Sequence, residues 1–164
     1  MCGVVAVIGK SLASSLVIEG LKRLEYRGYD SAGIASIDNN QLQVVKSEGK
    51  LKNLIEKFES AIKTKSYKNT KIAIGHTRWA THGNINIKNA HPLISSNKVA
   101  VVHNGIIENY LNLKEGLISE GYIFNSVTDT EVIPHLFVKY IKEGNNLLQA
   151  GKLVLKDIKG AFAF

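Results

Sequence analysis

The chain has 164 residues, enough for one domain, and its 45% hydrophobic and 21% charged residues are typical of a globular protein rather than a disordered or fibrous one. Its longest apolar runs fall far short of the roughly 20 residues of a membrane-spanning helix, and its N-terminus lacks a signal-peptide pattern, so we expect a cytoplasmic protein with no membrane partner. The formal net charge is +7, and eight lysines minus three glutamates between residues 46 and 71 supply +5 of it.

Hydrophobic periodicity predicts alternating strands and helices in the first half of the chain. In chain order we expect a buried strand at 2–8, a helix from Ala13 that Gly28 ends as its C-cap, a hairpin of strands 31–37 and 42–47 around Asp38-Asn39-Asn40, a helix at 51–62 and a strand at 71–76. The lysines then occupy the solvated side of the helix at 51–62. This clustering disfavours a nucleic-acid partner.

The second half opens with residues 77–91, which show neither the hydrophobic periodicity of a helix nor that of a strand. We expect this stretch to be a functional loop. We then predict a strand at 98–103 ended by a turn at Asn104-Gly105, a helix at 111–118 closed by Gly121, a helix from Thr128 with a Thr128-x-x-Glu131 capping box and an irregular first turn at Pro134, and the opening of a strand at 160–164. We expect the sequence to stop inside a domain and to leave an apolar strand edge unpaired. Hairpins mixed with helices favour an α+β fold with antiparallel sheets.

Cys2 is the single cysteine, so no intramolecular disulfide can form, which agrees with a reducing compartment. A lone cysteine in an apolar strand is most often a small buried hydrophobic residue. Removal of Met1, however, makes Cys2 the N-terminal residue. An α-amine with a pKa of about 7.7–8.0 can then act as general base for the thiol of the same residue. Cys2 is therefore a candidate nucleophile.

Arg78 and Trp79 lie in the second candidate segment, residues 75–83. One interpretation is a surface charge beside a tryptophan that packs on the core. The other is a substrate site, in which the planar guanidinium binds a carboxylate through two hydrogen bonds and the indole covers a small polar ligand.

Asn104-Gly105 and Asp129 are the remaining candidates. Asn-Gly after a strand is most often a turn, yet a side-chain amide beside a glycine N–H is also a pair of oxyanion donors. Asp129 lies in a helix cap and is able to accept hydrogen bonds from a substrate ammonium group. The five histidines show no i, i+4 pair on a predicted helix, so we expect no metal.

Five blocks of sequence, in order along the chain, carry a resemblance to a known family: CGVV at 2–5, LEYRGYDSAG at 24–33, HTRWATHG at 76–83, HNGIIEN at 103–109 and TDTEVI at 128–133. Together they closely resemble the glutaminase domain of class II glutamine amidotransferases. The wording of the second and third blocks is most similar to the glutamine–fructose-6-phosphate aminotransferase family. The purine amidophosphoribosyltransferases are the alternative within the class.

The resemblance implies a four-layer αββα N-terminal nucleophile hydrolase fold, incomplete at its C-terminal side, in which residues 1–164 are a partial glutaminase domain and the sugar-isomerase domains are absent. It implies the following roles: Cys2 as nucleophile, Asn104 and Gly105 as oxyanion donors, Arg78 and Asp129 as anchors of the substrate α-carboxylate and α-ammonium groups, Thr81 and His82 as lining of the pocket, Trp79 in a loop that closes over it, and Arg27, Tyr29 and His91 as supporting residues.

The implied reaction is hydrolysis of L-glutamine to glutamate and ammonia through a cysteine thioester, without a cofactor. In the full-length family the ammonia passes to a sugar-phosphate domain, where it converts fructose 6-phosphate to glucosamine 6-phosphate. The resemblance also implies that the full-length enzyme forms homo-oligomers. Two hypotheses of other classes stand beside this one. The chain could be a binding module that uses its basic helix for an acidic partner, or an inactive fragment.

Overall fold

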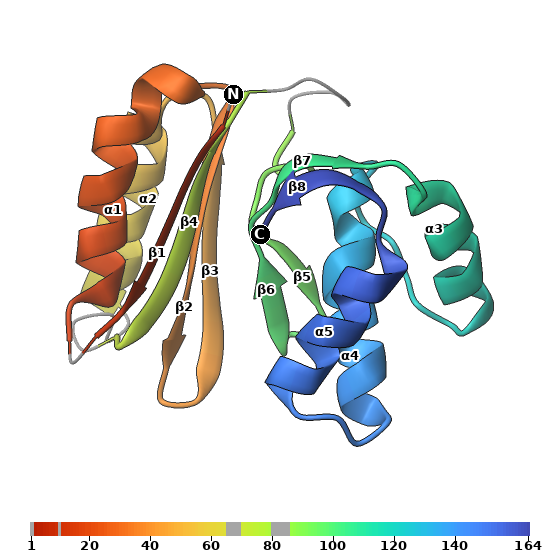
Figure 1. Cartoon of the computed structure of the whole chain (residues 1–164). Coiled ribbons are helices and arrows are strands. Elements are labelled where there is room, and N and C mark those ends of the chain that lie inside the picture. The colour runs from red at the N-terminus through yellow and green to blue at the C-terminus, as the bar shows by residue number, and fades with distance from the viewer. Residues whose placement is uncertain (1, 10, 65–69, 80–85) are drawn as a thin grey trace. The chain divides into compact units, whose positions relative to one another are not determined.

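The computed structural model describes residues 2–9, 11–64, 70–79 and 86–164. The chain divides into two compact units, Met1–Pro92 and Leu93–Phe164, which we call the N-terminal and the C-terminal unit and describe each by itself (Figure 1). None of the helices in the described ranges is both long enough and apolar enough to cross a bilayer.

The N-terminal unit is an antiparallel four-stranded sheet in the order β1-β4-β2-β3, with both helices on one face (Figure 1). Its elements are β1 (Gly3–Ile8), α1 (Ala13–Leu24), the 3-10 turn η1 (Glu25–Arg27), β2 (Ser31–Asp38), β3 (Gln41–Glu48), α2 (Leu51–Thr64) and β4 (Ile72–Arg78). Leu51, Leu54 and Phe58 of α2 are buried against the core, whereas Lys52 and Lys57 face solvent. The predicted amphipathic helix is thus confirmed.

The β2–β3 hairpin turns through Asn39 and Asn40, as predicted. Both have positive φ, 49° and 60°, and Asp38 pairs with Gln41. A two-residue hairpin turn with positive φ at both positions matches the twist of its strands, and asparagine tolerates this conformation better than most residues.

Gly28 is a C-cap, as predicted, but it ends the 3-10 turn η1 that follows α1, and its N–H donates to the Glu25 carbonyl at 3.0 Å. Its φ is −177°, an extended conformation that any residue adopts. A Cβ at this position would lie 2.6 Å from the carbonyl carbon of Arg78. Glycine is required here because the backbone at the end of β4 passes directly over it, a non-local constraint that helix-end patterns do not contain.

The C-terminal unit contains two antiparallel two-stranded sheets, β5–β6 and β7–β8, together with three helices (Figure 1). Its elements are β5 (Leu93–Ser95), β6 (Val99–Val101), β7 (Asn104–Ile107), α3 (Tyr110–Ser119), the 3-10 turn η3 (Asp129–Glu131), α4 (Val132–Lys142), α5 (Leu147–Asp157) and β8 (Gly160–Ala163). Its core is a second hydrophobic cluster that includes Ile107, Leu117, Ile133 and Val154.

Asn104-Gly105 does not form the predicted turn that ends a strand. The preceding strand ends at Val101, and Asn104 begins β7, whose partner β8 comes more than fifty residues later in the sequence. Because a strand requires a partner, the pairing with residues 160–163 overrides the local preference of Asn-Gly for a turn.

The helix expected from Thr128 begins at Val132 instead, after the 3-10 turn η3. Thr128 makes no side-chain cap hydrogen bond. Pro134 is the third residue of α4, where its missing N–H costs little because the first turn of a helix has unpaired donors in any case. The predicted irregular first turn is confirmed and the predicted capping box is wrong.

A capping box does exist, but at α5, a helix that the sequence interpretation missed. The side chain of Asn146 accepts the N–H of Gln149, and the Gln149 side chain accepts the N–H of Asn146. After α5 the chain forms β8 within the predicted strand at 160–164. This strand pairs with β7 on one side, and its other edge has no strand partner among the residues that the structure describes.

Candidate active site

Cys2 directly precedes β1, beside the end of β4. The register pairs Gly3 with Thr77, so Cys2 continues β1 opposite the last residues of β4. The backbone N–H of Trp79 donates to Cys2 Sγ at 3.2 Å, and the thiol lies 3.7 Å from the Trp79 carbonyl oxygen. The thiol is partly exposed. A partly exposed thiol held by backbone groups differs from the buried hydrophobic cysteine of the alternative interpretation.

The close approach of two neighbouring side chains explains why a glycine, Gly3, follows the cysteine. A Cβ at this position would lie 2.7 Å from Thr77 Oγ1 and 2.8 Å from Leu24 Cβ. The N–H of Gly3 donates to Thr77 Oγ1 at 3.2 Å. The missing side chain therefore lets β1 approach β4 and α1 closely enough to hold Cys2 next to Trp79.

Arg78 is the last residue of β4, which extends two residues beyond the predicted strand at 71–76. Its side chain is buried, with 6% of its surface exposed, so it is not the surface charge of the alternative interpretation. Its carbonyl accepts the N–H of Asp30 at 3.1 Å. Trp79 is 43% exposed and lies edge-on to Tyr29, with 5.4 Å between the ring centroids. The indole is therefore half-exposed and packs against Tyr29, whereas the Trp79 backbone contacts the thiol.

Four predicted site residues of the N-terminal unit remain: Arg27, Thr81, His82 and His91. Arg27 belongs to η1 and donates from Nε to the hydroxyl of Tyr26 at 3.1 Å. His91 is buried, and its ring lies 4.3 Å from that of His76. Thr81 and His82 lie outside the described residues.

Asn104 and Gly105 open β7 in the C-terminal unit. Gly105 has a φ of +128°, and a Cβ would lie 2.1 Å from the Ala161 carbonyl oxygen on β8. Two independent constraints, backbone conformation and the approach of β8, thus require glycine at this position. The Gly105 N–H belongs to a backbone that no other residue adopts without strain.

Asp129 is the first residue of η3 and contacts the same strand. Its Oδ2 accepts the backbone N–H of Ile107, the last residue of β7, at 2.7 Å. Its side chain is only partly buried. A carboxylate has about four acceptor positions, so this hydrogen bond leaves capacity for a substrate ammonium group.

Thr130 and His103 form a second link between η3 and the β7 region, which the sequence interpretation did not find. Thr130 Oγ1 lies 2.7 Å from His103 Nδ1, and both residues are buried. Burial lowers the pKa of His103, and the nearby Asp129 carboxylate raises it to a smaller extent. The imidazole is therefore predominantly neutral near pH 7.

Glu131 has a structural role in place of the predicted cap. Its carboxylate, 1% exposed, accepts the backbone N–H groups of Asn125 and Ser126 at 2.9 and 2.7 Å and the Ser126 hydroxyl at 2.6 Å. This one side chain therefore anchors the loop that leads into η3. In the sequence, the only sign of this anchoring role is that an acidic residue directly follows Asp129 and Thr130.

Replacing Glu131 with glutamine is expected to destabilise the fold by roughly 2–4 kcal/mol, because an amide nitrogen cannot accept and leaves a buried donor unpaired. Glu115→Gln on the exposed face of α3 is the matched control, with an expected change within about 0.5 kcal/mol. Denaturant unfolding of both variants measures the difference. Equal stability of the two variants would contradict the anchoring role.

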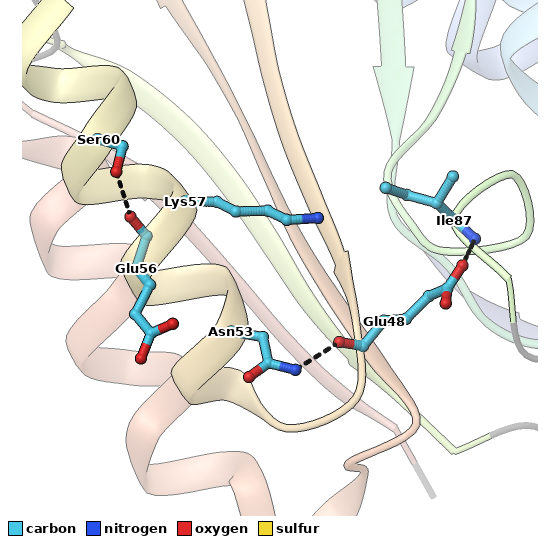
Figure 2. A pocket seen from close by; sticks show the side chains of 6 residues that line it. All are labelled: Glu48, Asn53, Glu56, Lys57, Ser60 and Ile87. Carbon is cyan, nitrogen blue, oxygen red and sulfur yellow. Dashed lines mark hydrogen bonds between the residues drawn. The ribbon is translucent and has the colours of Figure 1, made fainter.

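A cavity of about 640 Å³ lies elsewhere in the N-terminal unit, between α2, the end of β3 and Ile87 (Figure 2). The Glu48 carboxylate accepts the N–H of Ile87 at 2.8 Å, and the Glu48 carbonyl accepts the Asn53 side chain at 3.0 Å. The described residues that line the cavity are Glu48, Asn53, Glu56, Lys57, Ser60 and Ile87. None is a predicted site residue, so the cavity adds no group to the candidate site.

The structure thus brings the predicted residues together in two groups. Cys2, Arg78 and Trp79 meet at the junction of β1 and β4 in the N-terminal unit. Asn104, Gly105 and Asp129 meet on β7 and η3 in the C-terminal unit. In the described parts of the chain, no group of three or more His, Cys, Asp or Glu side chains is arranged to hold a metal ion.

The sequence of this chain is similar, over nearly its whole length, to those of known proteins. It is 48% identical over 163 residues to glutamine–fructose-6-phosphate aminotransferase (isomerizing) from Bartonella quintana, and 52% identical over 165 residues to the protein of that name from Aquifex aeolicus. These matches cover 99% and 100% of this chain but 26% and 27% of the relatives. The chain therefore spans about a quarter of the length of the curated relatives it matches.

Solved structures confirm the predicted fold class, the α+β N-terminal nucleophile hydrolase fold. The glutamine phosphoribosylpyrophosphate amidotransferase of B. subtilis, complexed with ADP and GMP, matches with a TM-score of 0.79 and 32% identity, over 99% of this chain and 34% of that one. An allosteric regulatory enzyme of purine biosynthesis matches with a TM-score of 0.80 at the same identity and coverage. Residues 76–164, more than half of the chain, match the family described as the glutamine amidotransferase domain. The chain belongs to this family.

Proposed function

We propose that this chain hydrolyses L-glutamine to glutamate and ammonia, with Cys2 as the nucleophile after removal of Met1. The observation that carries the proposal is the position of the thiol, 3.2 Å from the backbone nitrogen of Trp79, the residue after the buried Arg78, in a member of the glutamine amidotransferase domain family. A thiol with its own α-amine as general base is an arrangement that attacks amide carbonyls.

In the proposed reaction the sulfur attacks the side-chain amide carbon of glutamine, and the thiol proton passes to the α-amine. The carbonyl electron pair moves to the oxygen, which accepts hydrogen bonds from the Asn104 side-chain amide and the Gly105 N–H. When the tetrahedral intermediate collapses, the C–N bond breaks and the α-ammonium group gives its proton to the departing ammonia. Water then adds to the thioester, releases glutamate and restores the thiol.

Substrate binding in this proposal uses one cationic and one anionic anchor, as a zwitterionic amino acid requires. Arg78 pairs with the α-carboxylate through two hydrogen bonds, and Asp129 accepts the α-ammonium group. The partial exposure of Asp129 supports its role. The remaining proposed roles are pocket lining by Thr81 and His82, a cover formed by Trp79, and support from Arg27, Tyr29 and His91.

For the whole protein we propose that the ammonia converts fructose 6-phosphate to glucosamine 6-phosphate on a sugar-phosphate domain. The names of the relatives at 48% and 52% identity favour this acceptor. The phosphoribosylpyrophosphate amidotransferase, at 32% identity, is the less similar protein, and its reaction is the second candidate. Residues 1–164 are then part of one glutaminase domain of a homo-oligomeric enzyme, and a reducing cytoplasm suits its thiol.

Intact mass spectrometry with an electrophilic glutamine analogue tests the proposal. A diazo ketone analogue, 6-diazo-5-oxo-L-norleucine, alkylates a thiol with loss of N₂. We expect a chain without Met1 to gain one adduct, located at Cys2 by peptide mapping, and L-glutamine but not D-glutamine to slow the labelling. A chain that lacks Met1 and gains no adduct, or one whose labelling ignores L-glutamine, would refute the proposed function.

A further inference from the structure

The turn η3 uses three consecutive side chains to fix its surroundings. Asp129 accepts the N–H of Ile107, Thr130 bonds His103, and Glu131 anchors the preceding loop through Ser126. Each of the three hydrogen bonds is 2.7 Å long. A short turn that makes this many well-formed side-chain bonds is rigidly held, and so are the groups that it contacts.

Two of these bonds flank the proposed oxyanion donors. His103 directly precedes Asn104, and Ile107 is the second residue after Gly105. Thr130 therefore holds the chain immediately before the donor pair, and Asp129 holds it shortly after. The side chains of η3 thus contact both ends of this short segment.

The β7 strand is short and depends on such contacts for its orientation. It has four residues and pairs with β8 alone within the described sheet. Gly105 contributes no side chain, and its φ of +128° lies in a region where glycine has many accessible conformations. Oxyanion donors stabilise a transition state only when they are aimed at the developing charge before the reaction, so an anchor next to Asn104 affects the rate.

The chemistry of the Thr130–His103 contact suits a permanent anchor. Both side chains are buried, so water does not compete for the bond. In a neutral imidazole, Nδ1 is either a donor or an acceptor, and a hydroxyl group serves as the partner of both forms. The bond therefore persists whichever ring nitrogen carries the proton.

We propose that Thr130 is a positioning residue, whose hydroxyl group holds His103 and thereby orients the Asn104 amide and the Gly105 N–H toward the oxyanion. The inference rests on the proposed glutaminase function and adds a residue that does not contact the substrate. It predicts an effect on the chemical step, not on glutamine binding.

The test compares Thr130→Val, which keeps the shape and removes the hydroxyl, with Thr130→Ser, which keeps the hydroxyl. For Thr130→Val we expect kcat to fall about 10- to 100-fold, since misplacement of catalytic groups by about 1 Å costs on this scale. KM and the inhibition constant of the product glutamate should stay within about twofold. Thr130→Ser should recover kcat to within about threefold of the wild type.

Thr70→Val is the matched control for stability. Thr70 is buried in the N-terminal unit, and its hydroxyl oxygen accepts the Ser14 N–H at 3.0 Å and lies 2.8 Å from the Ser14 hydroxyl, so the substitution removes two buried hydrogen bonds. We expect it to lower the melting temperature at least as much as Thr130→Val does, without changing kcat. All rates are measured well below the lowest melting temperature. If Thr130→Val does not fold, Thr130→Ala also removes the hydroxyl group and places no methyl group in its position against the His103 imidazole.

The possible outcomes distinguish a failure of the positioning role from a failure of the proposed glutaminase function on which it rests. Wild-type turnover by Thr130→Val, or equal losses of kcat in Thr130→Val and Thr70→Val, overturns the positioning role while the glutaminase function stands. A wild-type protein that neither hydrolyses glutamine nor takes the diazo ketone label at Cys2 overturns the function and the inference together. Loss of kcat in Thr130→Val with rescue by serine supports the inference.

Discussion

Replacing Cys2 with alanine is expected to reduce glutamine hydrolysis by at least about three orders of magnitude, because no other group then forms the thioester. Turnover is measured as glutamate formation. The binding of L-glutamine, followed by calorimetry, should persist, since Arg78 and Asp129 are unchanged. The thiol acts in the chemical step and contributes little to ground-state affinity.

Stability should hardly change in this variant. Cys2 is partly exposed and its thiol contacts the backbone of Trp79, so we expect a change in unfolding free energy within about 1 kcal/mol. Cys2→Ser is the matched control, because it keeps a small polar group at the position with a far weaker nucleophile. Normal turnover by the alanine variant would show that Cys2 is not the nucleophile.

Replacing Gly105 with alanine is expected to cost roughly 3 kcal/mol or more of stability and about 100-fold or more in kcat. The added Cβ would lie 2.1 Å from the Ala161 carbonyl oxygen and 2.6 Å from Phe162 Cα, at a φ of +128°. Relief of this clash requires β7 to move away from β8, which displaces the Gly105 N–H. Denaturant unfolding and glutamate formation measure the two losses.

Gly116→Ala is the control for that experiment. Gly116 lies inside α3, and a Cβ at this position would meet nothing within 4 Å beyond its own helix backbone and chain neighbours. Alanine should therefore stabilise the helix by about 0.5–1 kcal/mol and leave turnover unchanged. If Gly105→Ala behaved like Gly116→Ala, the β7–β8 pairing and the proposed oxyanion donor would both be wrong.

Elements that depend on local patterns were predictable. The strand β1, the hairpin at Asn39-Asn40 and the amphipathic helix α2 follow from periodicity and turn preference, because each pattern spans only neighbouring residues. The helix α5 was predictable in principle from Asn146-x-x-Gln149, a capping pair in which asparagine takes the place of the more familiar serine or threonine.

The errors arose where other contacts of the folded chain compete with a local sequence pattern. Thr128-x-x-Glu131 has the form of a capping box, yet Glu131 bonds the backbone of Asn125 and Ser126 instead. A buried carboxylate gains more from several N–H donors in a folded loop than from one at a helix end. Asn104-Gly105 likewise enters a strand, because β8 supplies a partner from the far end of the chain.

The sequence by itself determined the candidate nucleophile, the candidate anchors Arg78 and Asp129, and the family, because these depend on residue types and their order. Only the tertiary structure decided that Cys2 lies against Trp79 and that Thr130 holds His103. Both contacts depend on strand register and on the approach of segments far apart in the chain. Such contacts follow from the packing of the whole fold, and no local pattern encodes them.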